Sequence, residues 1–207
     1  VSVRCATLSD LTSIVDVHCE AFPTFFLTRL GRRALHVYYS AVLMTTSGIL
    51  TVAMSGENII GFAAGTDSKK DLYWQLFKKP LSFGGTLIKA MLRGSVKVKE
   101  LFELVLRFCT SVRSTSHSES SLHIARRDFE LTSLAVMPMW QGRGCGQQLV
   151  QCMVQRACCL GSHSVSVLTD ALNNEKVLDF YSKQGFVNQE LVLRRDGRKM
   201  MRCWQLL

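Results

Sequence analysis

Residues 134–150 read LAVMPMWQGRGCGQQLV, and this stretch decides the fold. It begins as an apolar strand, turns at Pro138, and enters a helical pattern after glycines at positions 142, 144 and 146. Glycine leaves backbone N–H groups bare, so a bulky anion can come close to them. The helix that follows presents unpaired N–H groups and the positive end of its dipole. The stretch therefore predicts a cradle for a pyrophosphate that needs no basic side chain.

Other phosphate-binding loops fit these glycines less well. A dinucleotide fingerprint would run Gly-x-Gly-x-x-Gly, whereas Leu149 stands where the third glycine after Gly144 and Gly146 would be. The Gly-Lys-Ser/Thr ending of a nucleoside triphosphate loop does not occur in the sequence. Both nucleotide-binding classes are therefore disfavoured.

The glycine loop and a later block together resemble the Gcn5-related N-acetyltransferases. The cofactor motif of that family, Gln/Arg-x-x-Gly-x-Gly/Ala, is matched by Gln141, Gly144 and Gly146. Residues 174–186, NEKVLDFYSKQGF, are similar to the family's Asn-x-x-Ala-x-x-Phe-Tyr-x-x-x-Gly-Phe, with Val177 in place of the alanine. The resemblance covers residues 3–65 loosely and 129–207 well.

The resemblance implies an α/β (α+β) fold. Its mixed, strongly twisted central sheet has two splayed central strands and helices on both faces. Local periodicity agrees with this expectation. The expected strands are 1–6, 49–54, 59–65, 129–136, 164–169, 186–194 and 199–207. The expected helices are one capped by Ser9 or Asp10, then 27–43, 147–160 and 175–184.

We expect one acetyltransferase domain over residues 1–207, with a mostly helical, basic insertion at about 66–127. Between those limits 12 Lys or Arg residues stand against 5 Asp or Glu, which is most of the formal net charge of +9. The insertion ends in a polar run at 111–121 that we interpret as a mobile loop. Its apolar-basic pattern is compatible with a peripheral membrane contact or with a homodimer. No nucleic-acid-binding signature accompanies the charge.

By the same resemblance the cofactor is acetyl-CoA. The backbone of Leu134, Ala135 and Val136 would pair with the pantetheine amides, and Asn174 would bond the arm from the other side. A backbone N–H near Leu134, at a bulge of the strand, would polarise the thioester carbonyl. The pyrophosphate would contact Gln141, Gly142, Arg143, Gly144, Cys145, Gly146 and Gln147.

Two residues match the catalytic positions of the family. Glu130, at the start of the central strand, would take the proton of the amine, often through water; its alternative role is an exposed strand-end charge, and Asp170 is the weaker candidate. Tyr181 would protonate the leaving thiolate while its ring lies beside the cofactor; the alternative is a core aromatic residue. A covalent acyl group on Cys145 is disfavoured, because that residue would face the pyrophosphate. His18 could approach the acceptor.

The acceptor would be a primary amine of a small molecule, such as a nucleotide-linked amino sugar. Phe25, Arg29 and Arg32, with Arg33, would form the pocket for its anionic part. A solvated basic helix is the alternative interpretation of these arginines. Two other functions stay open: an acetyltransferase that acts on proteins or peptides, and a CoA-binding regulatory module without turnover.

Composition narrows the remaining classes. Hydrophobic residues make up 47% of the chain and charged residues 20%, which is typical of a globular protein. The eight cysteines form no Cys-x-x-Cys pair, so we expect no metal site. Without a signal-like N-terminus or a long apolar run, we expect a cytoplasmic protein with reduced thiols.

Overall fold

The structure is a computed structural model that describes residues 1–78, 127–194 and 197–207. In these residues seven strands form one sheet in the order β1-β2-β3-β4-β5-β7-β6. All neighbouring strands are antiparallel except β4 and β5, which are parallel, so the sheet is mixed as expected. The strands are β1 (Ser2–Cys5), β2 (Ile49–Ser55), β3 (Asn58–Thr66), β4 (Asp128–Val136), β5 (Ser164–Asp170), β6 (Asn188–Leu193) and β7 (Lys199–Leu206).

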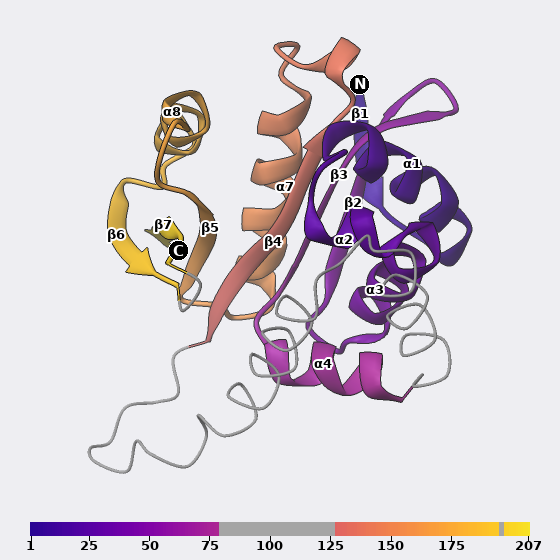
Figure 1. Cartoon of the computed structure of the whole chain (residues 1–207), viewed down its shortest axis with the longest axis horizontal. Coiled ribbons are helices and arrows are strands. Elements are labelled where there is room, and N and C mark those ends of the chain that lie inside the picture. The colour runs from indigo at the N-terminus through magenta and orange to yellow at the C-terminus, as the bar shows by residue number, and fades with distance from the viewer. Residues whose placement is uncertain (79–126, 195–196) are drawn as a thin grey trace.

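Helices cover both faces of the sheet (Figure 1). On one face, α1 (Leu11–Ala21) and α3 (Arg32–Met44) bury apolar positions such as Ile14 and Leu35 against β2 and β3. On the other face, α7 (Cys145–Cys159) buries Leu149 and Met153 in a second apolar core. The short helix α8 (Glu175–Lys183) contributes Tyr181 to that second core. The predicted fold class is confirmed.

The single helix expected at 27–43 is wrong. The structure divides it into α2 (Phe26–Leu30) and α3, because Gly31 between them has a φ of 97°. Glycine adopts this conformation without the steric penalty of a side chain. The chain can therefore turn between the two helices, and α3 lies across β2 and β3.

The cap expected for α1 is only partly confirmed. Asp10 occupies the N-cap position after the short 3₁₀ helix η1 (Leu8–Asp10), but its side chain caps no N–H of α1. Its carboxylate instead accepts two hydrogen bonds from Arg4, at 2.7 and 2.8 Å, and one from the backbone of Thr7. These bonds hold the pKa of Asp10 well below its ordinary value and join the end of β1 to the start of α1.

The two central strands separate partway along their length. β4 pairs with β5 only from Asp128–Ser164 to Leu131–Val167, although β4 continues to Val136 and β5 to Asp170. Beyond that point β5 continues to pair with β7 alone. The predicted splay between the central strands is therefore confirmed, and it opens beside the glycine loop.

The insertion is described only at its beginning. Helix α4 (Lys69–Phe77) starts after Ser68, whose hydroxyl accepts the N–H of Asp71 as an N-terminal cap. Residues 79–126, and with them the predicted polar loop at 111–121, lie outside the described residues. A single domain over 1–207 stays a prediction.

The C-terminal third follows the predicted order. Helix α8 ends before Gly185, which has a φ of 94°, and Gly197 in the turn before β7 has a φ of 83°. Both are positions where glycine avoids strain. None of the helices in residues 1–78, 127–194 and 197–207 combines the length and apolarity that a membrane crossing requires.

Candidate active site

The glycine loop forms an open anion cradle at the start of α7. After the 3₁₀ helix η2 (Pro138–Trp140), Gly142 and Gly144 have φ values of 73° and 80°. Gly144 is the N-cap of α7; no side chain caps this end of the helix, and its first turn carries no acidic residue. The N–H groups of the first turn and the positive end of the dipole are therefore available to an anionic ligand.

Cys145 can contact a ligand in this cradle through its backbone but not through its side chain. The side chain of Cys145 is buried in the core beneath α7, so the expectation that this residue faces the pyrophosphate is wrong for its thiol. Gly146 faces Phe180 instead, and a Cβ there would lie 3.5 Å from the Phe180 ring. These contacts bring α7 close to α8. Gln147, in the next position, is exposed.

Two side chains shape the rim of the loop. The Arg143 guanidinium lies over the Trp140 ring, 5.0 Å from its centre, and both residues remain accessible to a ligand. The Gln141 side chain turns inward and donates a hydrogen bond of 3.1 Å to the carbonyl of Val136. Gln141 thus connects the loop to the end of β4.

The opening between β4 and β5 exposes unpaired backbone groups. The N–H of Met137 donates to Ile60 on β3, and every second residue of an antiparallel strand bonds to the same neighbour. Ala135 therefore bonds to β3, whereas Leu134 and Val136 direct their N–H and C=O groups toward the opening. Of these groups, the Val136 carbonyl already accepts the amide of Gln141. Of the three residues expected to contact pantetheine through the backbone, the structure leaves two in a position to do so.

Asn174 borders the same opening from the other side. Its amide nitrogen donates to the hydroxyl of Thr169 and to the carbonyl of Asp170, at 2.7 and 2.9 Å. The side chain therefore fixes the end of β5, and the oxygen of its amide is the group left to accept an N–H from a ligand. Asp170 itself is ion-paired with Arg198 at 2.7 Å.

Tyr181 on α8 is packed into the apolar core on the α7 face of the sheet. Its side chain is largely buried, and its ring meets Phe180 and Phe186 edge-on. Burial, assisted by the neighbouring Cys203, raises the pKa of Tyr181 above its ordinary value. The hydroxyl thus keeps its proton at neutral pH, and the same shift makes it a weaker proton donor than an exposed tyrosine.

Glu130 lies in the part of β4 that is paired on both sides, opposite Thr66 on β3 and Ser166 on β5. Its carboxylate is half-buried and forms an ion pair with Lys69 on α4, with 2.5 Å between Oε2 and the lysine Nζ. Burial, and to a smaller extent the nearby charge of Glu130, raises the pKa of Tyr38 on α3 to about 12. Glu130 is thus neither an isolated surface charge nor fully enclosed.

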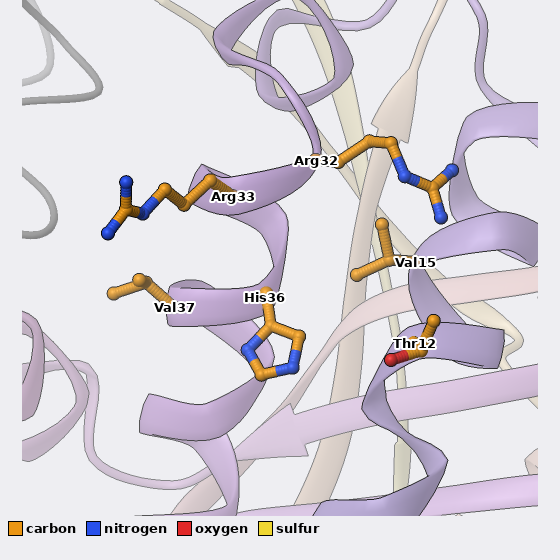
Figure 2. Close-up of a pocket in the computed structure, with 6 residues that line it drawn as sticks. All are labelled: Thr12, Val15, Arg32, Arg33, His36 and Val37. Atoms are coloured by element: carbon orange, nitrogen blue, oxygen red, sulfur yellow. The ribbon is translucent and has the colours of Figure 1, made fainter.

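The three residues expected to bind the acceptor do not line one described pocket. Phe25 is exposed and packs on Phe22, and Arg29 lies in α2. Arg32 forms an ion pair with Asp16 on α1 and borders a groove of about 340 Å³. Figure 2 shows that Arg32 and Arg33 leave α3 in opposite directions. The groove is lined by Thr12, Val15, Arg32, Arg33, His36 and Val37.

A polar cluster next to the opening escaped the sequence analysis. Tyr38 and Tyr39 on α3 reach the hydroxyls of Thr132 and Ser133 on β4, at 3.3 and 3.4 Å. His18 on α1 lies 2.6 Å from the Tyr39 hydroxyl. The adjacent tyrosines within an apolar helical repeat were the available signal, but only the fold brings them to β4.

The described residues fit acetyl-CoA. The uncapped N-terminus of α7 suits a pyrophosphate, and the unpaired edge of β4 suits the amides of a pantetheine arm. Residues 1–78, 127–194 and 197–207 hold no cluster of three or more His, Cys, Asp or Glu side chains arranged for a metal ion.

Comparison with known proteins gives the family. A sequence profile of the acetyltransferase (GNAT) family matches residues 11–186. No curated protein sequence matches the chain significantly.

Solved structures share the fold at low sequence identity. One structure is described as "histone acetyltransferase HPA2 and related acetyltransferase" from Corynebacterium glutamicum. It is 18% identical to this chain, with a TM-score of 0.61, and the match covers 99% of this chain and 94% of that chain. A spermidine N-acetyltransferase SpeG chimera from Vibrio cholerae and hSSAT is 13% identical with a TM-score of 0.60, covering 100% and 96%. The PaiA N-acetyltransferase from Thermoplasma acidophilum, crystallised with coenzyme A, is 11% identical with a TM-score of 0.57, covering 100% and 98%.

The family profile spans most of the chain, including the glycine loop, the opening and Tyr181. The chain belongs to the acetyltransferase (GNAT) family, whose members are acyltransferases that use acetyl-CoA.

Proposed function

We propose that this protein transfers the acetyl group of acetyl-CoA to a primary amine of a small molecule by direct attack of the amine. The observation that carries the proposal is the separation of β4 and β5 after Leu131, which ends beside the uncapped N-terminus of α7. An extended ligand with a pyrophosphate at one end can lie there with its acyl group between the strands. The residues that would hold it are Leu134, Val136, Gln141, Gly142, Arg143, Gly144, Cys145, Gly146, Gln147 and Asn174.

The chain supplies a donor for the charge that develops on the acyl oxygen. Bound acetyl-CoA contributes the thioester that is the acyl donor. The backbone N–H of Leu134 faces the opening and has no partner in β5. Such a pre-organised donor is worth about 3 kcal/mol of activation free energy in other acyl transfers.

Two side chains fit the proton transfers. An amine in water is mostly protonated at neutral pH, so Glu130 takes its proton, directly or through water. In the structure its carboxylate is ion-paired with Lys69, a contact that an incoming amine would have to displace. Tyr181 is protonated at neutral pH and would give its proton to the thiolate that leaves, a transfer that its raised pKa makes less favourable.

The acceptor amine is the component of the reaction about which the structure and the comparisons say least. Among the structural neighbours, one is named for spermidine and another for histone, so the shared fold does not choose between small amines and proteins. The charge of +9 and the arginines of α2 and α3 support an acceptor with an anionic part, of which a nucleotide-linked amino sugar is one. The alternatives are a protein or peptide amine, and CoA binding without turnover.

The proposed location is the cytoplasm. All cysteines in the described residues are free thiols, as a reducing compartment keeps them. Contact with a membrane surface and formation of a homodimer stay predictions, because the segment that suggested them lies outside the described residues.

The test is release of free thiol from acetyl-CoA against a panel of amines. The panel holds nucleotide-linked amino sugars, aminoglycosides, polyamines and peptides with free N-termini, each with the N-acetylated form as the control. Turnover of a small amine, with its mass increased by one acetyl group, supports the proposal. Turnover of peptides alone favours the protein-directed alternative, and tight acetyl-CoA binding without turnover favours the regulatory module.

A further inference from the structure

The β4 strand contains a bulge where its pairing with β5 ends. Ala64 on β3 pairs with Ser133 and Gly65 pairs with Leu131, so Thr132 is an extra residue without a partner. The last pair between β4 and β5 is Leu131 with Val167. The bulge thus separates the paired part of β4 from the part that faces the opening.

The bulge turns two consecutive hydroxyl groups toward α3. Neighbouring residues of a regular strand point to opposite faces of the sheet, yet Thr132 and Ser133 both contact α3. The Tyr38 hydroxyl donates to Thr132 Oγ1 at 3.3 Å, and the Tyr39 hydroxyl donates to Ser133 Oγ at 3.4 Å. Thr132 in turn donates to the carbonyl of Ala64 at 3.1 Å. One residue pair of a rigid helix therefore contacts both residues of the bulge.

Tyr39 is itself fixed in the core. Its side chain is fully buried, and its ring stands edge-on to Phe62 and to His18. His18 Nδ1 lies 2.6 Å from the Tyr39 hydroxyl. Burial lowers the pKa of His18 to about 4 and raises the pKa of Tyr39 well above its ordinary value, so both groups are neutral at physiological pH.

The Tyr39 hydroxyl lies between Ser133 and His18 and can donate a hydrogen bond to only one of them. A tyrosine hydroxyl has one proton, and Tyr39 gives it to Ser133. With that donor assignment, the 2.6 Å contact has His18 carrying its proton on Nδ1 and donating it to the Tyr39 oxygen; in the other tautomer Tyr39 would donate to His18 instead. His18 thereby orients the Tyr39 hydroxyl toward the bulge.

We propose that Tyr39 and Ser133 are positioning residues that set the direction of the Leu134 N–H, with His18 orienting Tyr39. The inference rests on the proposed function, in which that N–H polarises the acyl carbonyl. The carbonyl of Ser133 and the N–H of Leu134 belong to one planar peptide unit. Holding Ser133 on the α3 side therefore fixes where the Leu134 N–H points. Since both tyrosine contacts are long for hydrogen bonds between hydroxyls, a small rotation of the bulge is enough to break them.

The test measures polarisation of the acyl carbonyl without requiring turnover. Acetyl-CoA labelled with ¹³C at the carbonyl is bound to the full chain, and the ¹³C chemical shift is compared with that of the free compound. The wild type is expected to move the resonance downfield. Tyr39→Phe and Ser133→Ala each lose most of that movement, whereas the Kd for acetyl-CoA from calorimetry stays close to the wild-type value. The double variant loses no more than the more affected single variant, because both changes remove one contact.

Two further variants separate positioning from general damage to β4. Ser133→Thr keeps a hydroxyl and is expected to keep most of the downfield movement. Ser164→Ala removes a hydroxyl that donates to Asp128 at the other end of β4, at 2.6 Å, and leaves the resonance unchanged. In an active preparation, kcat of the Tyr39→Phe and Ser133→Ala variants falls about tenfold. This is less than the roughly 10²–10³-fold cost of removing an oxyanion donor, because the N–H is redirected and not removed.

The outcomes are distinct for the inference and for the proposed function. The inference is overturned if Tyr39→Phe and Ser133→Ala show the wild-type downfield movement of the carbonyl resonance. It is also overturned if Ser164→Ala loses as much of that movement as they do. In both cases thiol release by the wild type still supports the proposed function. No downfield movement in the wild type also overturns the inference. Loss of the movement in the two variants supports it, even if no amine of the panel is acetylated.

Discussion

The ammonium of Lys69 lies 2.5 Å from a carboxylate oxygen of Glu130. Lys69 begins the helix that follows β3, and Glu130 lies on the neighbouring strand β4, paired with Thr66. The ion pair therefore connects the start of the insertion to the strand that carries the proposed base. If the proposed mechanism holds, the amine must reach this carboxylate, so Glu130 is the first proposed catalytic group to test.

Replacing Glu130 by Gln should slow acetyl transfer without affecting cofactor binding. General base catalysis contributes about 10²–10⁴-fold in other enzymes, and we expect kcat/KM for the amine to fall within that range at pH 7. The loss should shrink as the pH approaches the pKa of the amine, because an unprotonated amine needs no base. Steady-state kinetics from pH 6 to 10 check this, and a variant as active as the wild type at pH 7 removes Glu130 from the mechanism.

Tyr181→Phe should reduce kcat and leave the fold intact. The phenyl ring keeps the edge-on contacts with Phe180 and Phe186, and only the proton donor is lost. We expect kcat to fall on the order of 10²-fold, with little change in the Kd for acetyl-CoA. Thiol release and calorimetry on the same sample separate the two quantities. Unchanged kcat would assign Tyr181 to the core alone.

Gly144→Ala should weaken acetyl-CoA binding. Gly144 has a φ of 80°, which strains an L residue by about 1–2 kcal/mol, and relief of that strain would turn the first N–H groups of α7 away from the pyrophosphate. Gly161→Ala is the matched control, since Gly161 has a φ of 74° but lies beyond the other end of α7. Both variants lose stability, and only Gly144→Ala is expected to raise the Kd. Equal Kd values in the two variants would contradict a role for the loop.

Acid should destabilise the fold through His18. Its pKa is lowered by burial to about 4, whereas an unfolded histidine has a pKa of about 6.5. The unfolded chain therefore binds more protons between these values, and stability is full above about pH 6.5 and falls as the pH drops toward 4. From pH 7 to pH 5 the loss from this residue is roughly 2 kcal/mol.

Denaturant unfolding of the wild type and of His18→Asn checks this dependence. Asparagine has no proton to gain in this range, and its amide can replace the Nδ1 donor to Tyr39. The difference in unfolding free energy between pH 7 and pH 5 should be about 2 kcal/mol smaller in the variant. The same pH dependence in both proteins would show that His18 is accessible to water.

The sequence predicted the elements that are set by local pattern. Gly56, Gly185 and Gly197 stand at turns where a positive φ is needed, and the predicted hairpin and helix ends are found there. The helix expected over 27–43 was wrong because Gly31 also lies within an apolar helical repeat. A glycine inside such a repeat is compatible with a helix, and only packing on the sheet decides for a break.

The site was predictable where one motif carries it, and not where distant segments meet. The position of the loop at 141–147 before α7 could be placed from its motif. The roles of the loop and of Tyr181 stay predictions. The ion pair of Lys69 with Glu130 and the contact of Tyr39 with Ser133 join residues that are 61 and 94 positions apart. No local periodicity reports such contacts. The burial of the Cys145 thiol likewise depends on which side of α7 faces the sheet.

The central claim is that the opening and the loop bind acetyl-CoA through its pyrophosphate, and calorimetric titration tests it most directly. We predict a Kd for acetyl-CoA in roughly the micromolar range typical of substrates. Acetyl-4′-phosphopantetheine, which lacks the pyrophosphate and the adenosine, should bind much more weakly, and Gly144→Ala should reduce this difference. No heat of binding with acetyl-CoA, or equal affinity for the truncated compound, would contradict the account.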